Sequence, residues 1–209
     1  MKKNFAFVVV KFTHGSVPIV TIPNPALNQK TNKVKEFGKS LEKILKDMRD
    51  TLDAAKEPEG AGISANQIGI PLSVCIVRKF YFSTKENEEC NSPSEDFTKK
   101  ENLQKEGNIN TNQFEEKILI NPKITSTSKE ADIDWEGCLS VPGLYGKVKR
   151  PYKIKVSYTD ETGKIQKLNA TGFFARVIQH EIDHLNGILF TSKVIGNLVG
   201  EEFFNDESN

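Results

Sequence analysis

The chain has 209 residues and a mass of 23.4 kDa, which suits one domain with at most one added segment. Its 29 Lys and Arg residues nearly balance 28 Asp and Glu residues, which argues against a protein that binds nucleic acid or an anionic membrane mainly through charge. Three cysteines are too few for a scaffold built from disulfides, and they fit a reducing compartment.

The N-terminal region carries an apolar run at residues 5–10, directly after two lysines. The run is shorter than a secretory signal and lacks a small-residue cleavage site, so an opening β-strand is the better interpretation. No apolar run approaches the roughly 20 residues that a membrane-spanning helix needs. We therefore expect a cytoplasmic protein without membrane contact, or an organellar one whose transit peptide has been removed.

An amphipathic helix is predicted at about residues 33–55, because apolar residues recur there at spacings of three and four. These residues are Val34, Phe37, Leu41, Ile44, Leu45, Met48 and Leu52. Residues 72–77 then form an apolar, β-branched run that predicts a buried strand. The next stretch, about residues 83–116, is polar and has no period, which predicts an insertion into a single catalytic domain spanning residues 1–209.

Strand structure resumes at residues 117–122, and residues 153–158 and 164–168 form a predicted β-hairpin. A second helix is expected at about residues 171–186, followed by Gly187 at the position of a C-terminal helix cap. The predicted fold class is α+β, with mostly antiparallel sheets packed around the C-terminal helix and with the amphipathic helix near the N-terminus.

The C-terminal helix contains the pattern H-E-x-x-H, formed by His180, Glu181 and His184. Residues four apart lie on the same face of a helix, so the two imidazoles could bind one divalent metal beside the glutamate. Chance matches to three fixed positions are common, and an exposed helix is the plain alternative. A site of this type needs a third ligand, and Cys138, in a segment bounded by glycine and proline, is the best placed cysteine.

Three ordered segments together resemble the motifs of the peptide deformylase family. They are GAGISANQ at residues 60–67, EGCLS at 136–140 and QHEIDHLNG at 179–187, with Ser64 where the family usually has Ala. The resemblance implies a metal-dependent hydrolase that removes the N-formyl group from the N-terminal methionine of new polypeptides. It also implies Cys138, His180 and His184 as the metal ligands, with Fe(II) as the family metal and Zn, Ni or Co as substitutes.

The resemblance further implies the roles of the residues around the metal. Glu181 would be the general base, and the Gln67 side chain and the Leu139 N–H would donate to the oxyanion. We expect an extended peptide to bind along Gly60, Ala61, Gly62 and Gly137, and a methionine side chain to enter a pocket lined by Phe173 and Val177. Ordinary core packing is the alternative for the last two residues. Glu136, Arg150 and Asp183 are expected to orient the ligands, with a structural salt bridge as the alternative.

The same segments indicate the partner that we expect and bear on two alternative functions. The expected partner is an N-formyl-methionyl peptide. The tail is short and acidic rather than a long basic helix, which argues against ribosome docking by such a helix and leaves at most a transient contact. A metallo-endopeptidase of the H-E-x-x-H type is disfavoured because no histidine follows His184. A catalytically silent peptide-binding module with a structural metal is disfavoured because it would need neither Glu181 nor Gln67.

Overall fold

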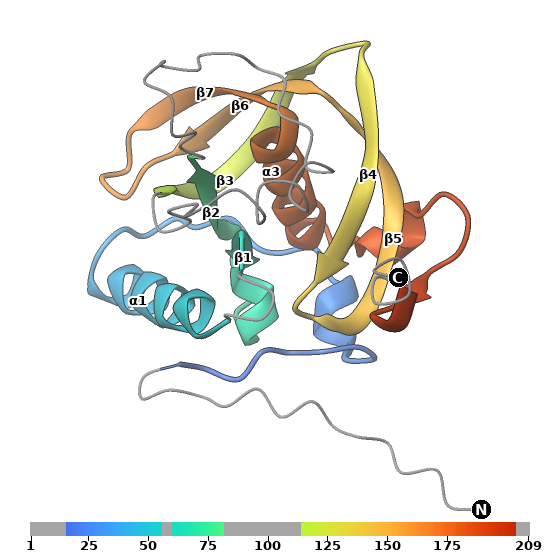
Figure 1. Ribbon diagram of the computed structural model, residues 1–209. Helices are drawn as coiled ribbons and strands as arrows, with labels where there is room; N and C mark the ends of the chain where they lie inside the picture. The colour runs from blue at the N-terminus through green and yellow to red at the C-terminus, as the bar shows by residue number, and fades with distance from the viewer. Residues whose placement is uncertain (1–15, 56–59, 82–113, 204–209) are drawn as a thin grey trace, which may run out of the picture.

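The computed structural model describes residues 16–55, 60–81 and 114–203 and contains two antiparallel sheets and two α-helices (Figure 1). The five-stranded sheet has the order β1 (Gly62–Ser64), β2 (Val74–Phe80), β3 (Phe114–Thr127), β6 (Lys153–Thr159) and β7 (Ile165–Thr171). The three-stranded sheet has the order β4 (Ala131–Cys138), β5 (Val141–Pro151) and β8 (Val199–Gly200). The helices are α1 (Lys39–Ala54) and α3 (Gly172–Leu185), and the short 3-10 helices are η1 (Pro25–Asn28), η2 (Ala65–Ile68) and η4 (Phe190–Lys193).

Helices α1 and α3 pack against the two faces of the five-stranded sheet, because side chains alternate along its strands. Val74 and Ile76 of β2 belong to the core cluster of α1, whereas Cys75 and Val77 belong to the core cluster of α3. Figure 1 shows α3 between this sheet and the β4–β5 hairpin. Burial of two apolar faces thus positions α3, which carries the H-E-x-x-H pattern.

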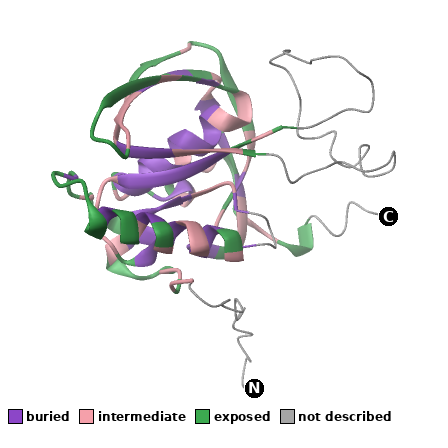
Figure 2. Cartoon of the chain, turned by 90° about the vertical axis from the view of Figure 1, so that its left-hand side faces the viewer, coloured by how far each residue is buried: buried purple, intermediate pink, exposed green. Residues whose placement is uncertain are grey.

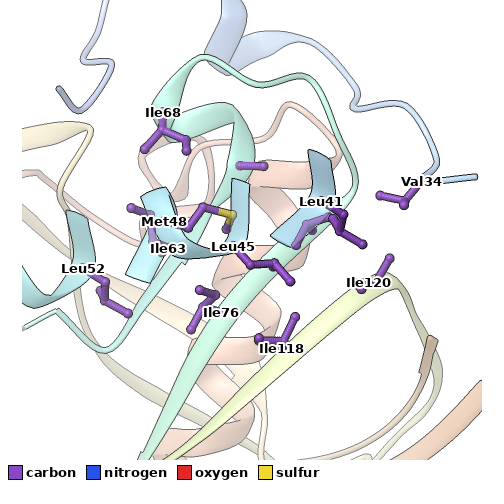
Figure 3. Packing of buried hydrophobic residues seen from close by; sticks show 12 residues of the cluster. Val34, Leu41, Leu45, Met48, Leu52, Ile63, Ile68, Ile76, Ile118 and Ile120 are labelled. Atoms are coloured by element: carbon purple, nitrogen blue, oxygen red, sulfur yellow. The ribbon is translucent and has the colours of Figure 1, made fainter. Parts of the chain in front are cut away.

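Helix α1 is amphipathic, and its inner face forms the cluster drawn in Figure 3. Leu41, Leu45, Met48 and Leu52 of α1 are at most 5% exposed and point towards the sheet, while exposed residues lie on the outer side of the helix (Figure 2). The helix begins at Lys39, after the N-cap Gly38, rather than near residue 33 as predicted.

The reason for the late helix start is a pair of extended-chain contacts just before α1. Asn32 bridges Leu72, and the Val34 N–H donates to Asn121 Oδ1 at 2.9 Å, which holds these residues extended. Val34 is nevertheless buried against the same cluster as the helix, so its hydrophobicity indicates core contact without helical structure.

Helix α3 and the β6–β7 hairpin lie close to the residues predicted for them. Helix α3 spans Gly172–Leu185, with Thr171 as N-cap and with Gly187 at a φ of 72° beyond its end. Strands β6 and β7 form the predicted hairpin. The α+β class with antiparallel sheets is confirmed. No helix within the described ranges is long and apolar enough to span a membrane.

Two parts of the sequence interpretation differ from the structure or lie outside it. Residues 114–116 belong to β3 and pair with β2, so the end of the predicted polar insertion at residue 116 is wrong. Glu116 is polar yet pairs with Arg78 of β2, and its carboxylate meets Arg49 of α1 at 2.8 Å. The rest of that insertion and the predicted strand at residues 5–10 lie outside the described residues.

Replacement of Met48 by Ala tests the role of α1 in the core. Met48 is fully buried, so Met48→Ala should lower the free energy of unfolding by about 2–5 kcal/mol through lost burial and the cavity left behind. Urea unfolding followed by circular dichroism measures the change. Ser40→Ala, at an exposed position of the same helix, should change the stability by less than about 0.5 kcal/mol. An equal effect of both variants would contradict the assignment.

Candidate metal centre and active site

Three potential ligand atoms converge between β4 and α3. They are Cys138 Sγ, His180 Nε2 and His184 Nε2, which all lie within 4.8 Å of one another. The His184 Nε2 atom is 3.1 Å from Cys138 Sγ and 3.2 Å from His180 Nε2. Ligands of a tetrahedral zinc-type site are spaced roughly 3.3–3.6 Å apart, as its bond lengths require. The cluster therefore fits one divalent cation with three protein ligands.

The local sequence explains how these three residues meet. His180 and His184 are one turn apart on α3, and Cys138 ends β4 at the tight turn into β5. The β4–β5 register shifts between Gly137 and Cys138, and this irregularity changes the direction of the strand at the ligand. Burial lowers the pKa of His184 well below its usual value, with the neighbouring His180 adding to the effect, which favours the neutral imidazole that a metal requires.

Glu136 holds His180 in place from β4. Its Oε2 atom lies 3.0 Å from His180 Nδ1, which leaves Nε2 directed at the cluster. Arg150 donates to both oxygens of Glu136, each at 2.9 Å, and Arg176 Nη1 donates to Oε1 at 2.9 Å. Burial would raise the pKa of Glu136, but the hydrogen bonds from Arg150 and His180 dominate and hold it well below its ordinary range.

Asp183 extends this network to the end of the helix. Its carboxylate meets Arg150 Nη1 at 2.5 Å and Lys193 Nζ at 2.6 Å. The structure thus brings together Glu136, Arg150 and Asp183 in one salt-bridge network, in which Glu136 alone bonds directly to a predicted ligand, His180. Sequence reasoning missed Arg176. It lies four residues before His180 on the same helix face, but its partner Glu136 is 40 residues away in sequence.

Glu181 follows the ligand His180 on α3 and is buried. It is 3% exposed, and a Cβ atom at Gly62 would stand 2.7 Å from its Oε1 atom. Burial raises the pKa of Glu181 to about 7, against the lowering effects of His180 and of a hydrogen bond from Ser64. Within the described part of the chain, Glu181 Oε2 has no hydrogen-bond partner. This carboxylate can accept and release a proton near neutral pH.

Gln67 approaches the cluster from η2. Its Nε2 atom lies 3.6 Å from Cys138 Sγ and 3.1 Å from Ser140 Oγ. Leu139 lies between Cys138 and Ser140 at the tip of the β4–β5 hairpin, where the Ser140 N–H donates to Cys138 Sγ at 3.4 Å. The structure therefore brings Gln67 and Leu139 next to the ligand cysteine.

The three glycines expected to make room for a peptide have close neighbours within the protein itself. A Cβ atom would meet Leu52 at Gly60, Glu181 at Gly62 and Tyr145 at Gly137. Room for a peptide is therefore not the whole reason for these glycines. Side chains of the protein itself already occupy the space that a Cβ atom would take at each position.

The other predicted substrate contacts lie around the apolar face of α3. Val177 is buried, and Ala61 and Phe173 are partly buried against the same core cluster. Ala61 also joins β1 to β2, because its carbonyl accepts from the Arg78 N–H at 2.8 Å. These contacts place all three residues on the cluster that also contains Ile178 and Ile182 of α3.

Known proteins resemble this chain over most of its length. The sequence model described as polypeptide deformylase matches residues 16–197. The chain belongs to this family. Peptide deformylase 1 of Bacillus cereus is 39% identical over 176 residues, which cover 84% of this chain and 90% of that protein. The peptide deformylase of Prochlorococcus marinus strain NATL1A is 36% identical over 176 residues, covering 84% and 72%.

Solved deformylase structures have the same fold. The Synechococcus elongatus enzyme in complex with actinonin superimposes with a TM-score of 0.65 at 30% identity, covering 94% of this chain and 85% of that one. The Acinetobacter baumannii enzyme with bound Met-Ala-Ser also gives 0.65, at 28% identity and with coverage of 86% and 98%. The family activity, metal-dependent removal of the N-formyl group from nascent polypeptides, confirms the function predicted from the three motifs.

Substitution of Glu136 tests whether the network serves the ligand cluster. Glu136→Gln should weaken Ni(II) or Zn(II) binding about 10–100-fold, because the neutral amide has one acceptor oxygen in place of two and cannot serve both the two arginines and His180. It should also destabilise the fold by about 3 kcal/mol or more, since the buried charge that Arg150 and Arg176 share is removed while Asp183 pairs with Arg150 alone. Chelator competition and urea unfolding measure the two effects. The matched control Asp132→Asn, with a side chain 58% exposed, should leave both near wild type.

A methyl group at position 62 tests the close packing of Glu181. Gly62→Ala should lower deformylation by about 10-fold or more, because the carboxylate must move from its position beside the cluster. Formate release measures the rate, and metal content should stay unchanged. Gly38→Ala is the control, since a Cβ atom there meets nothing within 4 Å. A wild-type rate for Gly62→Ala would show that Glu181 has room to move.

Proposed function

We propose that this chain removes formyl groups from N-formyl-methionyl peptides with Cys138, His180 and His184 as the ligands of one divalent cation. The observation that carries the proposal is the convergence of these three ligand atoms between β4 and α3, with Gln67 Nε2 3.6 Å from Cys138 Sγ and with the buried carboxylate of Glu181 interacting electrostatically with His180. Fe(II) is the proposed physiological ion, from the family resemblance, and the Cys/His/His set also suits zinc. A bound cation of this kind polarises a carbonyl oxygen and acidifies water.

Glu181 is the proposed proton carrier. It accepts a proton from the water that attacks the formyl carbon, and it then delivers this proton to the departing amine as the carbon–nitrogen bond breaks. The products are formate and a peptide with a free amino terminus. A pKa of about 7, raised by burial, suits a group that must both accept and donate a proton at neutral pH.

Gln67 and Leu139 are the proposed donors to the oxyanion. The Gln67 amide nitrogen lies 3.6 Å from Cys138 Sγ, and the N–H of Leu139 directly follows the ligand cysteine in the chain. Fixed donors of this kind stabilise the negative charge that develops on a carbonyl oxygen during attack.

The free edge of β1 is the proposed binding place of the peptide backbone. Among the residues that the structure describes, β1 pairs only with β2, which leaves its other edge without a strand partner there. Ala61 bonds to β2, and the alternation of an antiparallel pair turns the N–H and C=O groups of Gly62 to the free edge. An extended peptide can pair there as an added strand. Phe173 and Val177 are the proposed wall of the methionine pocket.

A reducing, cytoplasmic location is also proposed for this enzyme. Thiolate ligation by Cys138 supports it, because an exposed or metal-bound thiolate is readily oxidised.

Formate release from formyl-Met-Ala-Ser tests the activity directly. Protein purified anaerobically with Fe(II) or Ni(II) should release formate, and a chelator should abolish the release. Glu181→Gln should keep its metal and lose about 10²–10⁴-fold in kcat. Glu161→Gln, at an exposed turn, is the matched control and should behave as wild type.

Three other outcomes would contradict parts of the proposal. Absence of formate from metal-loaded protein would refute deformylation and favour a silent binding module. Cleavage of an internal peptide bond would indicate an endopeptidase. Unchanged turnover of Glu181→Gln would refute the proton-carrier role alone.

A further inference from the structure

The proposed oxyanion donor Gln67 belongs to a buried group of polar side chains. Ser64, Asn66 and Gln67 are 0%, 2% and 2% exposed, although all three carry hydrogen-bonding side chains. Polar groups that are removed from water must hydrogen-bond to one another, because each unpaired buried group would destabilise the fold. Their mutual bonds therefore decide how each side chain is oriented.

Ser64 fixes which way the Gln67 amide faces. Its backbone N–H donates to Gln67 Oε1 at 2.9 Å, and its hydroxyl lies 3.0 Å from the same oxygen. With Oε1 held on this side, the NH2 group must face Cys138 and Ser140. The flipped amide would place Oε1 against the sulfur and leave its NH2 facing the donor N–H of Ser64.

Asn66 connects the same hydroxyl to the metal-site helix. Its Oδ1 lies 2.8 Å from Ser64 Oγ, and its Nδ2 donates to the main-chain carbonyl of His184 at 2.8 Å. Close polar contacts therefore run from His184 through Asn66 and Ser64 to Gln67, and the single hydroxyl proton of Ser64 is donated to one of the two amide oxygens at a time. The Ser64 side chain also reaches the Glu181 carboxylate and lowers its pKa.

We propose that Ser64 is a positioning residue, whose hydroxyl holds the Gln67 amide with its NH2 group towards the reacting carbonyl. This inference rests on the proposed function and extends it, because Gln67 stabilises an oxyanion only when it presents a donor. Ser64 touches none of the three ligand atoms. Its hydroxyl reaches both Gln67 and the Glu181 carboxylate, so the double-mutant cycle isolates the part of its effect that acts through Gln67. The hydroxyl has one proton and several acceptors, so its loss affects Asn66 as well as Gln67.

Removal of the hydroxyl gives the first measurement. Ser64→Ala should lower kcat for formyl-Met-Ala-Ser about five- to tenfold, the effect of one hydrogen bond, with KM within about twofold of wild type. The absorption spectrum of the Co(II)-loaded variant should match wild type, because the three ligands are untouched. Ser128→Ala, which removes a hydrogen-bonded hydroxyl between β3 and β4, is the matched control and should keep the wild-type kcat.

A double-mutant cycle separates positioning from general support of the fold. If Ser64 acts through Gln67, then Ser64→Ala should cause no further loss of kcat in a Gln67→Ala background. An equal loss in both backgrounds would overturn the inference, as would a wild-type kcat for Ser64→Ala. Ser64→Cys keeps the volume and a weaker donor, so it should give an intermediate kcat even where the alanine variant folds poorly.

A measurement without turnover completes the test. The side-chain amide protons of Gln67, assigned by their absence in Gln67→Ala, should exchange slowly with solvent in wild type and at least several-fold faster in Ser64→Ala. Unchanged exchange would refute the orienting role. Because the wild-type protein is assayed first, absence of formate release there would refute the proposed function, whereas failure of the cycle or of the exchange test would refute only the role of Ser64.

Discussion

The site depends on the buried ion pairs that the carboxylate of Glu136 forms with its neighbours. A carboxylate away from water is costly unless it is fully compensated, and here two guanidinium groups and one imidazole surround it. These partners come from β5 and α3, while Glu136 itself comes from β4. The hairpin and the helix cannot separate without leaving buried charges unpaired. Because Cys138 follows Glu136 by two residues, the same bonds bring the thiol to the two histidines.

Apolar packing and polar bonding therefore act on different faces of one helix. The stripe of α3 that contains Ile178 and Ile182 packs against the five-stranded sheet and sets the position of the helix. The neighbouring face, with His180 and His184, meets the second sheet through bonds rather than through apolar contact. Glu181 lies where burial is nearly complete and compensation is partial, and its pKa of about 7 follows from that imbalance.

Features that depend on neighbours in sequence could be predicted, whereas features that depend on distant partners could not. The spacing of His180 and His184, the cap at Gly187 and the β6–β7 hairpin follow from local periodicity and turn residues. The long β4–β5 hairpin was missed, because its inward positions include Arg150 and small residues instead of a regular apolar alternation. An arginine such as Arg176 usually indicates a solvated surface, and only the tertiary fold reveals Glu136 as its partner.

The three family segments, at residues 60–67, 136–140 and 179–187, depend on one another because hydrogen bonds connect each of them to the other two. The Asn66 amide bonds to the His184 carbonyl, His180 bonds to Glu136, and Gln67 Nε2 bonds back to Ser140 Oγ beside the ligand cysteine. A circuit of buried bonds resists displacement of any single member, since each group would lose a partner without regaining water. The donors and ligands therefore stand in place before substrate arrives, which is the condition under which fixed dipoles stabilise a developing charge without reorganisation.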